Sequence, residues 1–194
     1  MPNLSPSQQI ELSIGGLCTR WAHLEDAFFD TLNYFFQGVD PQRYDILRNE
    51  LEMRDAINLL KHMSIDTPIG STGSHLISLC DTVNSTLRND RNRIIHDPIY
   101  RIHGYERYTN KTFIRKQPKP VRLETFAVAR ISPELVNALS EAIQDAEKYL
   151  GAITLCIDEF LYCGGESVEA TVGLDIEARA FEATIASYIA MAKS

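Results

Sequence analysis

The fold of this chain is decided by residues 7–38, which read SQQIELSIGGLCTRWAHLEDAFFDTLNYFFQG. Apolar side chains recur there every three or four positions, which is the spacing of one face of an α-helix. The stripe consists of Ile10, Ile14, Leu17, Trp21, Leu24, Phe28, Leu32 and Phe35. Gly38 follows it and is a typical C-terminal stop. A helix of about 30 residues is roughly 45 Å long, and this length suits a helical bundle or a dimer interface.

The same periodicity predicts four further helices. Asp40-Pro41 and Ser132-Pro133 are start signals, because each places a capping side chain before a proline at the first helical position. The expected helices span about 41–63, 75–96, 133–163 and 176–191, with a loop containing glycine and proline at 64–74. The apolar stripe of the second one drifts near Met53.

Between residues 99 and 131 the helical period is lost. Short, roughly alternating apolar stretches are separated there by glycine, asparagine and proline, which is typical of a small β-hairpin or an irregular excursion. The predicted fold is therefore all-α: an antiparallel bundle of four to five helices with this insertion at about 99–131. We expect one domain over 1–194, with a core at about 7–163 and a helical extension at about 166–194.

The composition is that of an ordinary globular protein of 194 residues, 44% apolar and 23% charged. A chain of this length buries one hydrophobic core. Its N-terminus lacks the basic and apolar regions of a signal peptide, and no apolar run is long enough to span a bilayer. We therefore expect a cytoplasmic protein without a membrane partner. The four cysteines show no metal-binding spacing, which predicts buried thiols, no metal site and no cofactor.

Charge is distributed unevenly along the chain. The net charge is −7, which argues against binding of polyanions by the whole surface. The stretch from Arg88 to Arg122, however, holds ten basic and three acidic residues, so its own balance is +7. This basic middle on an acidic body indicates either a localised footprint for a polyanion or a solvated hairpin without a partner.

Residues 87–98 concentrate side chains that handle phosphates and protons. They read LRNDRNRIIHDP and close the third predicted helix, because Asp97 precedes a proline. Arginine offers a planar fork of donors for a phosphate, asparagine can orient a water or hydroxyl, and histidine titrates near neutrality. Together these groups suffice for metal-free phosphodiester transfer. The alternative is structural, since cations at a helix C-terminus complement the helix dipole.

The segment Arg91-Asn92-Arg93-Ile94-Ile95-His96 resembles the signature of the HEPN superfamily. That signature is an arginine, usually followed by a small polar residue, and a histidine after four to six intervening positions. Four residues intervene here, and Asn92 is the polar one. The order of helices around the segment is similar to that family over about residues 7–163. The insertion at 99–131 and the segment after Gly165 would be additions to a four-helix core.

The resemblance implies a function. HEPN domains are helical bundles that usually dimerise, and many are metal-independent endoribonucleases that serve as toxins or in antiviral defence. A homodimer of this kind cleaves single-stranded RNA by attack of the 2′-hydroxyl and leaves a 2′,3′-cyclic phosphate. On this resemblance His96 would move the proton, Arg91 would stabilise the phosphorane, and Asn92 would position phosphate or water.

Other basic residues would contact the RNA, namely Arg88, Arg93, Arg101 and Arg107. For Arg101 and Arg107, the alternative is an amphipathic hairpin that covers the helices. A cognate antitoxin or another partner protein would fit the same class of protein. The alternative function is that of a non-catalytic, dimeric helical protein whose polar turn binds a nucleotide or a protein partner, or caps its own helix.

Overall fold

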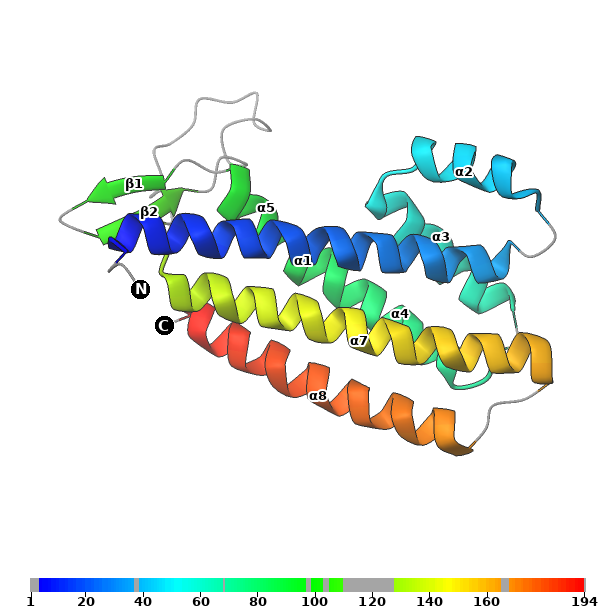
Figure 1. Ribbon diagram of the computed structural model, residues 1–194. Coiled ribbons are helices and arrows are strands. Elements are labelled where there is room, and N and C mark those ends of the chain that lie inside the picture. The colour runs from blue at the N-terminus through cyan, green and yellow to red at the C-terminus, as the bar shows by residue number, and fades with distance from the viewer. Residues whose placement is uncertain are drawn as a thin grey trace, which may run out of the picture.

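The computed structural model describes residues 4–36, 39–67, 69–96, 99–102, 105–109, 128–164 and 168–193. Helices dominate this part of the chain, which confirms the predicted all-α class (Figure 1). The helices are α1 (Pro6–Phe35), α2 (Pro41–Glu50), α3 (Met53–Asp66), α4 (Thr72–Thr82), α5 (Arg88–His96), α7 (Pro133–Cys163) and α8 (Val168–Lys193). A five-residue π-helix, η1 (Val83–Leu87), joins α4 to α5.

The predicted first helix is confirmed as α1. Its N-terminus is held by a reciprocal pair of hydrogen bonds, in which the Gln8 N–H donates to the Ser5 hydroxyl and the Ser5 N–H donates to the Gln8 side chain. The apolar stripe faces the core, and four of its members are fully buried: Leu17, Leu24, Phe28 and Leu32. The helix ends at Phe35. The expected stop, Gly38, lies outside the described residues.

Helix α7 lies at the centre of the helical assembly, with α1 on one side and α8 on the other (Figure 1). The Ser132 hydroxyl accepts from the N–H of Leu135, and Pro133 follows this cap, as the sequence predicts. Gly164 ends the helix with a φ of +76°, a left-handed conformation that costs glycine least. The fully buried stripe of α7 comprises Val136, Leu139, Ala142, Ile143, Ala146, Leu150, Ile153, Cys156 and Ile157.

The two longest helices, α1 and α7, run in the same direction. Arg20 of α1 donates a hydrogen bond to Gln144 of α7, and the hydroxyls of Thr31 and Thr154 lie 2.8 Å apart. The partners are separated by 124 and 123 residues, and so nearly constant an offset requires a parallel pair. The α1–α7 pairing therefore departs from the predicted antiparallel order. The cause is the stretch of shorter helices between them, which returns the chain to the end where α1 begins.

Helices α7 and α8, by contrast, are antiparallel. Asp145 of α7 accepts from the Thr184 hydroxyl of α8, and one turn later along α7 the ring of Tyr149 lies 5.8 Å from that of Phe181. The last helix begins at Val168, eight residues before the predicted start at Ile176. Periodicity missed this first part because its apolar side chains fall on both faces. The buried face of α8 comprises Ala170, Leu174, Ala178, Phe181 and Tyr188.

The single helix predicted for residues 41–63 is wrong. The chain bends at Leu51, whose backbone is extended, and the two halves are α2 and α3. Only Tyr44 of α2 is buried, whereas α3 buries one full face, so the two stretches cannot continue as one helix with one apolar side. The predicted loop at 64–74 is also too long, because α3 continues to Asp66 and α4 begins at Thr72.

Three short strands lie in the stretch predicted as an insertion: β1 (Ile99–Ile102), β2 (Tyr105–Thr109) and β3 (Val128–Arg130). They form an antiparallel sheet in the order β1-β2-β3, in which Tyr100 pairs with Arg107 and Tyr108 with Ala129. Residues 103–104 and 110–127 of the predicted insertion lie outside the described residues. The sheet follows α5 and stands at the end of the assembly where α1 begins (Figure 1).

The buried face of α1 predicts a large difference between two leucines of the same helix. We expect Leu24→Ala to lower the free energy of unfolding by about 2–5 kcal/mol, because the side chain is 0% exposed and its removal leaves a cavity. The matched control, Leu12→Ala, changes a leucine that is 68% exposed and should change stability by less than about 0.5 kcal/mol. Urea unfolding measures both. Equal losses would contradict the orientation of α1.

Candidate functional site

The polar segment predicted as the site is presented by α5, directly after the π-helix. Val83 and Leu87 are buried, and they continue the apolar stripe of α4 into α5. Single π-turns within α-helices are frequently found at functional sites. Here the wider turn precedes Arg88, the first residue of α5. The helix ends at His96, and Asp97 and Pro98, the predicted stop, lie outside the described residues.

Arg91 occupies a core-facing position of α5. It follows the buried Leu87 by four residues and precedes the buried Ile94 by three, so all three share one face. The guanidinium carbon of Arg91 lies 5.4 Å from the ring centroid of Trp21 on α1, and the ring attracts the cation. Arg91 Nη1 also donates to Asn92 Oδ1 at 3.0 Å. Two of the predicted catalytic residues are thus in contact, and α1 holds one of them.

Two guanidinium groups of α5 retain an unused donor. The Nε atoms of Arg88 and Arg91 are buried, and neither finds an acceptor among the described residues. Burying such a donor without a partner costs about 1–3 kcal/mol. An anion that reached this face of α5 would recover that loss, because arginine donates in a fork that matches phosphate oxygens.

Glu25 also lies in this environment, one turn after Trp21 on α1. Burial raises the pKa of the Glu25 carboxyl above its ordinary value, the positive charge of Arg91 partly offsets that rise, and Asp26 adds to it. The Glu25–Arg91 interaction places negative charge on the α1 side of the guanidinium. The apolar stripe predicted only a core position for Trp21, because a contact between helices leaves no trace in local periodicity.

Arg93 contacts an acidic residue of its own helix, and its predicted contact with RNA stays a prediction. Its Nη1 lies 3.7 Å from Asp90 Oδ1, and the other oxygen of Asp90 accepts from the Tyr188 hydroxyl at 2.8 Å. Tyr188 is buried and belongs to the last turns of α8. Asp90 therefore links the C-terminal helix to the polar segment, and it also forms an ion pair with Arg93. Nothing in the local sequence signals the link between Asp90 and Tyr188.

His96 is exposed at the end of α5. It lies five positions after Arg91, which corresponds to a rotation of about 140° on an ideal helix. The imidazole is accessible to solvent, whereas the Arg91 guanidinium is partly buried against α1. The helix alone therefore does not bring the two groups onto one face.

The other two predicted RNA contacts lie in the sheet. In the register of the sheet, Arg101 on β1 lies opposite Glu106 on β2. Arg107 on β2 lies opposite Tyr100 on β1 and Arg130 on β3. Both strands come directly after α5 in the chain and lie at the same end of the molecule as α5 (Figure 1). Their predicted contact with RNA stays a prediction.

Comparisons with protein-family models, curated proteins and solved structures find no match for this chain. Within the described residues, no group of three or more histidine, cysteine, aspartate or glutamate side chains is placed to hold a metal ion. No described helix combines the length and the apolarity that crossing a membrane requires. The functional proposal therefore rests on the sequence signature and on the geometry of α5 and its neighbours.

The raised pKa of Glu25 predicts a pH-dependent effect of its replacement. Because the pKa of Glu25 is higher in the folded protein than in the unfolded chain, the protonated carboxyl favours the folded state. This stabilisation is complete below the pKa of the unfolded chain. It is lost as the pH rises through the pKa of the folded protein. We expect Glu25→Gln to raise the free energy of unfolding near pH 7 and to change it little below about pH 4. Urea unfolding across this range measures the difference.

The matched control is Glu11→Gln, at an exposed position of the same helix. A Glu25→Gln variant that loses stability near pH 7 would contradict the dominance of burial. Glu25 would then act chiefly as the ionic partner of Arg91.

Proposed function

We propose that this chain is a metal-independent endoribonuclease of the HEPN type that cleaves single-stranded RNA as a homodimer. The observation that carries the proposal is the presence on one helix, α5, of an exposed His96 and of an Arg91 that Trp21 and Asn92 hold in place. An arginine anchored before substrate arrives loses little side-chain entropy on binding a phosphate. The helical class of the fold and the buried donors of Arg88 and Arg91 support the same conclusion.

The proposed reaction is an internal transfer. The imidazole of His96 removes the proton of the ribose 2′-hydroxyl, and the resulting oxygen attacks the adjacent phosphorus. The bond from phosphorus to the 5′-oxygen breaks, which leaves a 2′,3′-cyclic phosphate and a 5′-hydroxyl. Arg91 stabilises the charge of the phosphorane, and Asn92 positions a phosphate oxygen. The histidine of a second copy supplies the proton to the leaving oxygen.

The proposed dimer would bring together groups that one chain keeps apart. On α5 the exposed His96 and the partly buried Arg91 lie about 140° apart on an ideal helix. Two α5 ends that face each other would surround one phosphate with two imidazoles and two guanidinium groups. Arg88, Arg101 and Arg107 would then contact flanking phosphates. The proposal also includes a helical-bundle core with an insertion after α5, a cytoplasmic location, and a toxin or antiviral role with a cognate partner protein.

A second function is favoured by a specific observation. The Arg91 guanidinium packs on Trp21, and Asp90 joins Arg93 to Tyr188. These contacts fasten α5 to α1 and α8, which is what a purely structural polar turn would do. In this case the chain is a non-catalytic helical dimer that binds a nucleotide or a protein partner.

Cleavage of labelled single-stranded RNA in the presence of EDTA separates the two functions. We expect the wild-type chain to produce 2′,3′-cyclic phosphate ends and His96→Ala to be slower by at least about 100-fold, because a positioned acid or base contributes that much. Arg91→Ala should be slow as well. His23→Ala removes an exposed histidine of α1 and should retain the wild-type rate.

An RNA with a 2′-deoxyribose at the cleaved position should resist cleavage, because the nucleophile is missing. Sedimentation equilibrium should find a dimer. A wild-type chain without RNA cleavage, a His96→Ala variant as fast as His23→Ala, or a monomer at assay concentration would each sink the enzymatic proposal. A stable dimer with no turnover is the result expected of the non-catalytic protein.

A further inference from the structure

A second candidate site lies at the opposite end of the helical assembly from α5. A cavity of about 900 Å³ opens there between the last turns of α1, the start of α2 and the last turns of α7. In Figure 1 this is the right-hand end of the molecule, whereas α5 and the sheet lie at the left. The volume falls in the range of about 300–1,000 Å³ that is usual for sites of small molecules.

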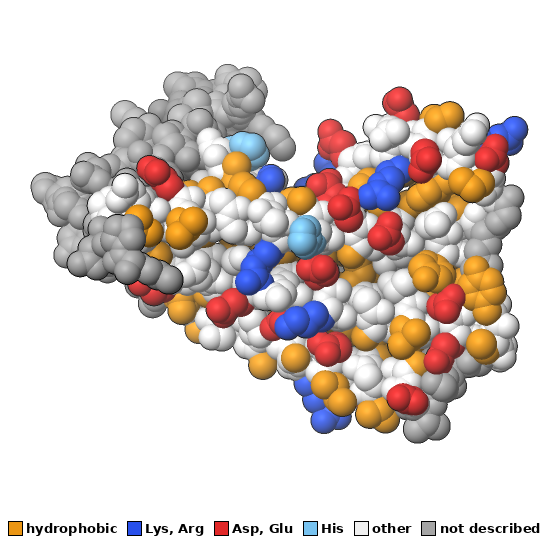
Figure 2. All heavy atoms as spheres, in the orientation of Figure 1, with side chains coloured by type: hydrophobic (Ala, Val, Ile, Leu, Met, Phe, Trp, Pro, Cys, Tyr) orange, Lys and Arg blue, Asp and Glu red, His pale blue; other side chains and the backbone are white. Residues whose placement is uncertain are grey.

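The cavity is negatively charged. Its lining includes Asp30, Asp45 and Asp158 and contains no lysine, arginine or histidine among the described residues. Arg48 neutralises Asp30 only in part, since its Nη1 lies 3.5 Å from Asp30 while its Nη2 lies 2.7 Å from Asp26. Within the described part of the chain, Asp45 and Asp158 form no ion pair. Figure 2 shows acidic side chains gathered over α2 and the adjoining part of α1.

The parallel arrangement of α1 and α7 adds to this negative potential. Both helices end at the cavity, and a helix C-terminus carries a partial charge of about −0.5. In an antiparallel pair, the N-terminus of one helix lies beside the C-terminus of the other and cancels its charge. The C-termini of α1 and α7 lie at the same end, so they do not cancel each other. The N-termini of α2 and α8 offset a part of it, because both helices begin at this end, and Asp40 caps the N-terminus of α2. The cavity therefore attracts cations through backbone dipoles as well as through carboxylates.

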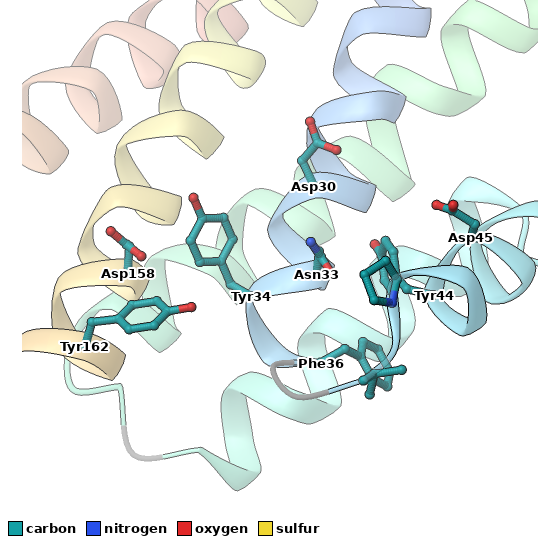
Figure 3. Close-up of a pocket in the computed structure, with 10 residues that line it drawn as sticks. Asp30, Asn33, Tyr34, Phe36, Tyr44, Asp45, Asp158 and Tyr162 are labelled. Carbon is teal, nitrogen blue, oxygen red and sulfur yellow. The ribbon is translucent and has the colours of Figure 1, made fainter.

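Aromatic rings form the rest of the lining. Figure 3 shows the ring of Tyr34 on α1 lying on the same side as Asp158 and Tyr162 of α7, whereas Tyr44 and Asp45 stand on α2 on the other side. Tyr44 is buried and its hydroxyl donates to the Phe29 carbonyl, so this residue forms a fixed wall of the cavity. Tyr162 is 63% exposed and offers a large aromatic face to solvent.

We propose that this cavity binds a small organic cation with two or more amino groups, of the polyamine class. Aromatic faces attract ammonium groups, and their apolar surface accommodates the methylene chain between them. Asp45 and Asp158 lie on opposite sides of the end of α1, so each would take a separate ammonium group (Figure 3). A metal ion fits the site poorly, because its ligands must converge on one point and these carboxylates are separated.

Calorimetric titration of the full chain with spermidine at physiological salt tests the proposal. We expect saturable binding. Asp45→Asn and Asp158→Asn should each weaken it about tenfold, since a hydrogen bond to a charged group contributes that much. Tyr162→Ala should weaken it through the loss of the aromatic face. Asp175→Asn, which neutralises an exposed aspartate of α8 outside the cavity, is the matched control and should bind as the wild type does.

Three results would overturn the proposal. One is the absence of saturable binding. Another is an equal loss of affinity in Asp175→Asn and Asp158→Asn, which would indicate diffuse attraction by an acidic surface. The third is binding of a lysine-rich peptide or of Mg²⁺ in the cavity without binding of spermidine. Circular dichroism of each variant establishes that it is folded, so that a loss of binding reports on the cavity.

Discussion

The structure depends on the burial of one apolar face of α1 against α7. Both apolar stripes avoid water by packing against each other, and this packing of an amphipathic face contributes more to helix stability in a protein than intrinsic helix propensity does. Two polar contacts within this interface, Arg20 with Gln144 and Thr31 with Thr154, determine how the helices align. The buried apolar area supplies the attraction between the two helices, and these polar contacts favour one offset along their axes.

This alignment gives the molecule two different ends. Because α1 and α7 are parallel, their dipoles add, and both positive ends lie toward the sheet and α5. The basic part of the chain begins at α5, where anions would be attracted, whereas the aspartates of the cavity lie at the negative ends. The proposed RNA site and the proposed polyamine site thus use opposite poles of one helix pair. A net charge of −7 conceals this separation.

The polar turn illustrates how a core position can serve chemistry. Leu87 and Ile94 bracket Arg91 on the inward face of α5, where an apolar residue is ordinarily expected. Trp21 compensates by accepting the guanidinium over its ring, so the cation is held without a full ion pair. The same contact that stabilises the packing of α5 on α1 also reduces the freedom of a group proposed to act on phosphate. The contact between Arg91 and Trp21 therefore serves both the packing of α5 and the preorganisation of the guanidinium. RNA cleavage by the His96 and Arg91 variants distinguishes a catalytic role of this contact from a purely structural one.

The sequence by itself determined the helical class, the apolar stripes of α1 and α7, the caps at Asp40 and Ser132, and the residues of the polar turn. These properties are local, since a stripe or a cap depends on side chains within one or two turns. Tertiary structure alone decided the break at Leu51, the parallel order of α1 and α7, and the contacts of Arg91 and Asp90 with other helices. Those features depend on which faces meet across long separations in the chain, and local periodicity specifies a face but never its partner.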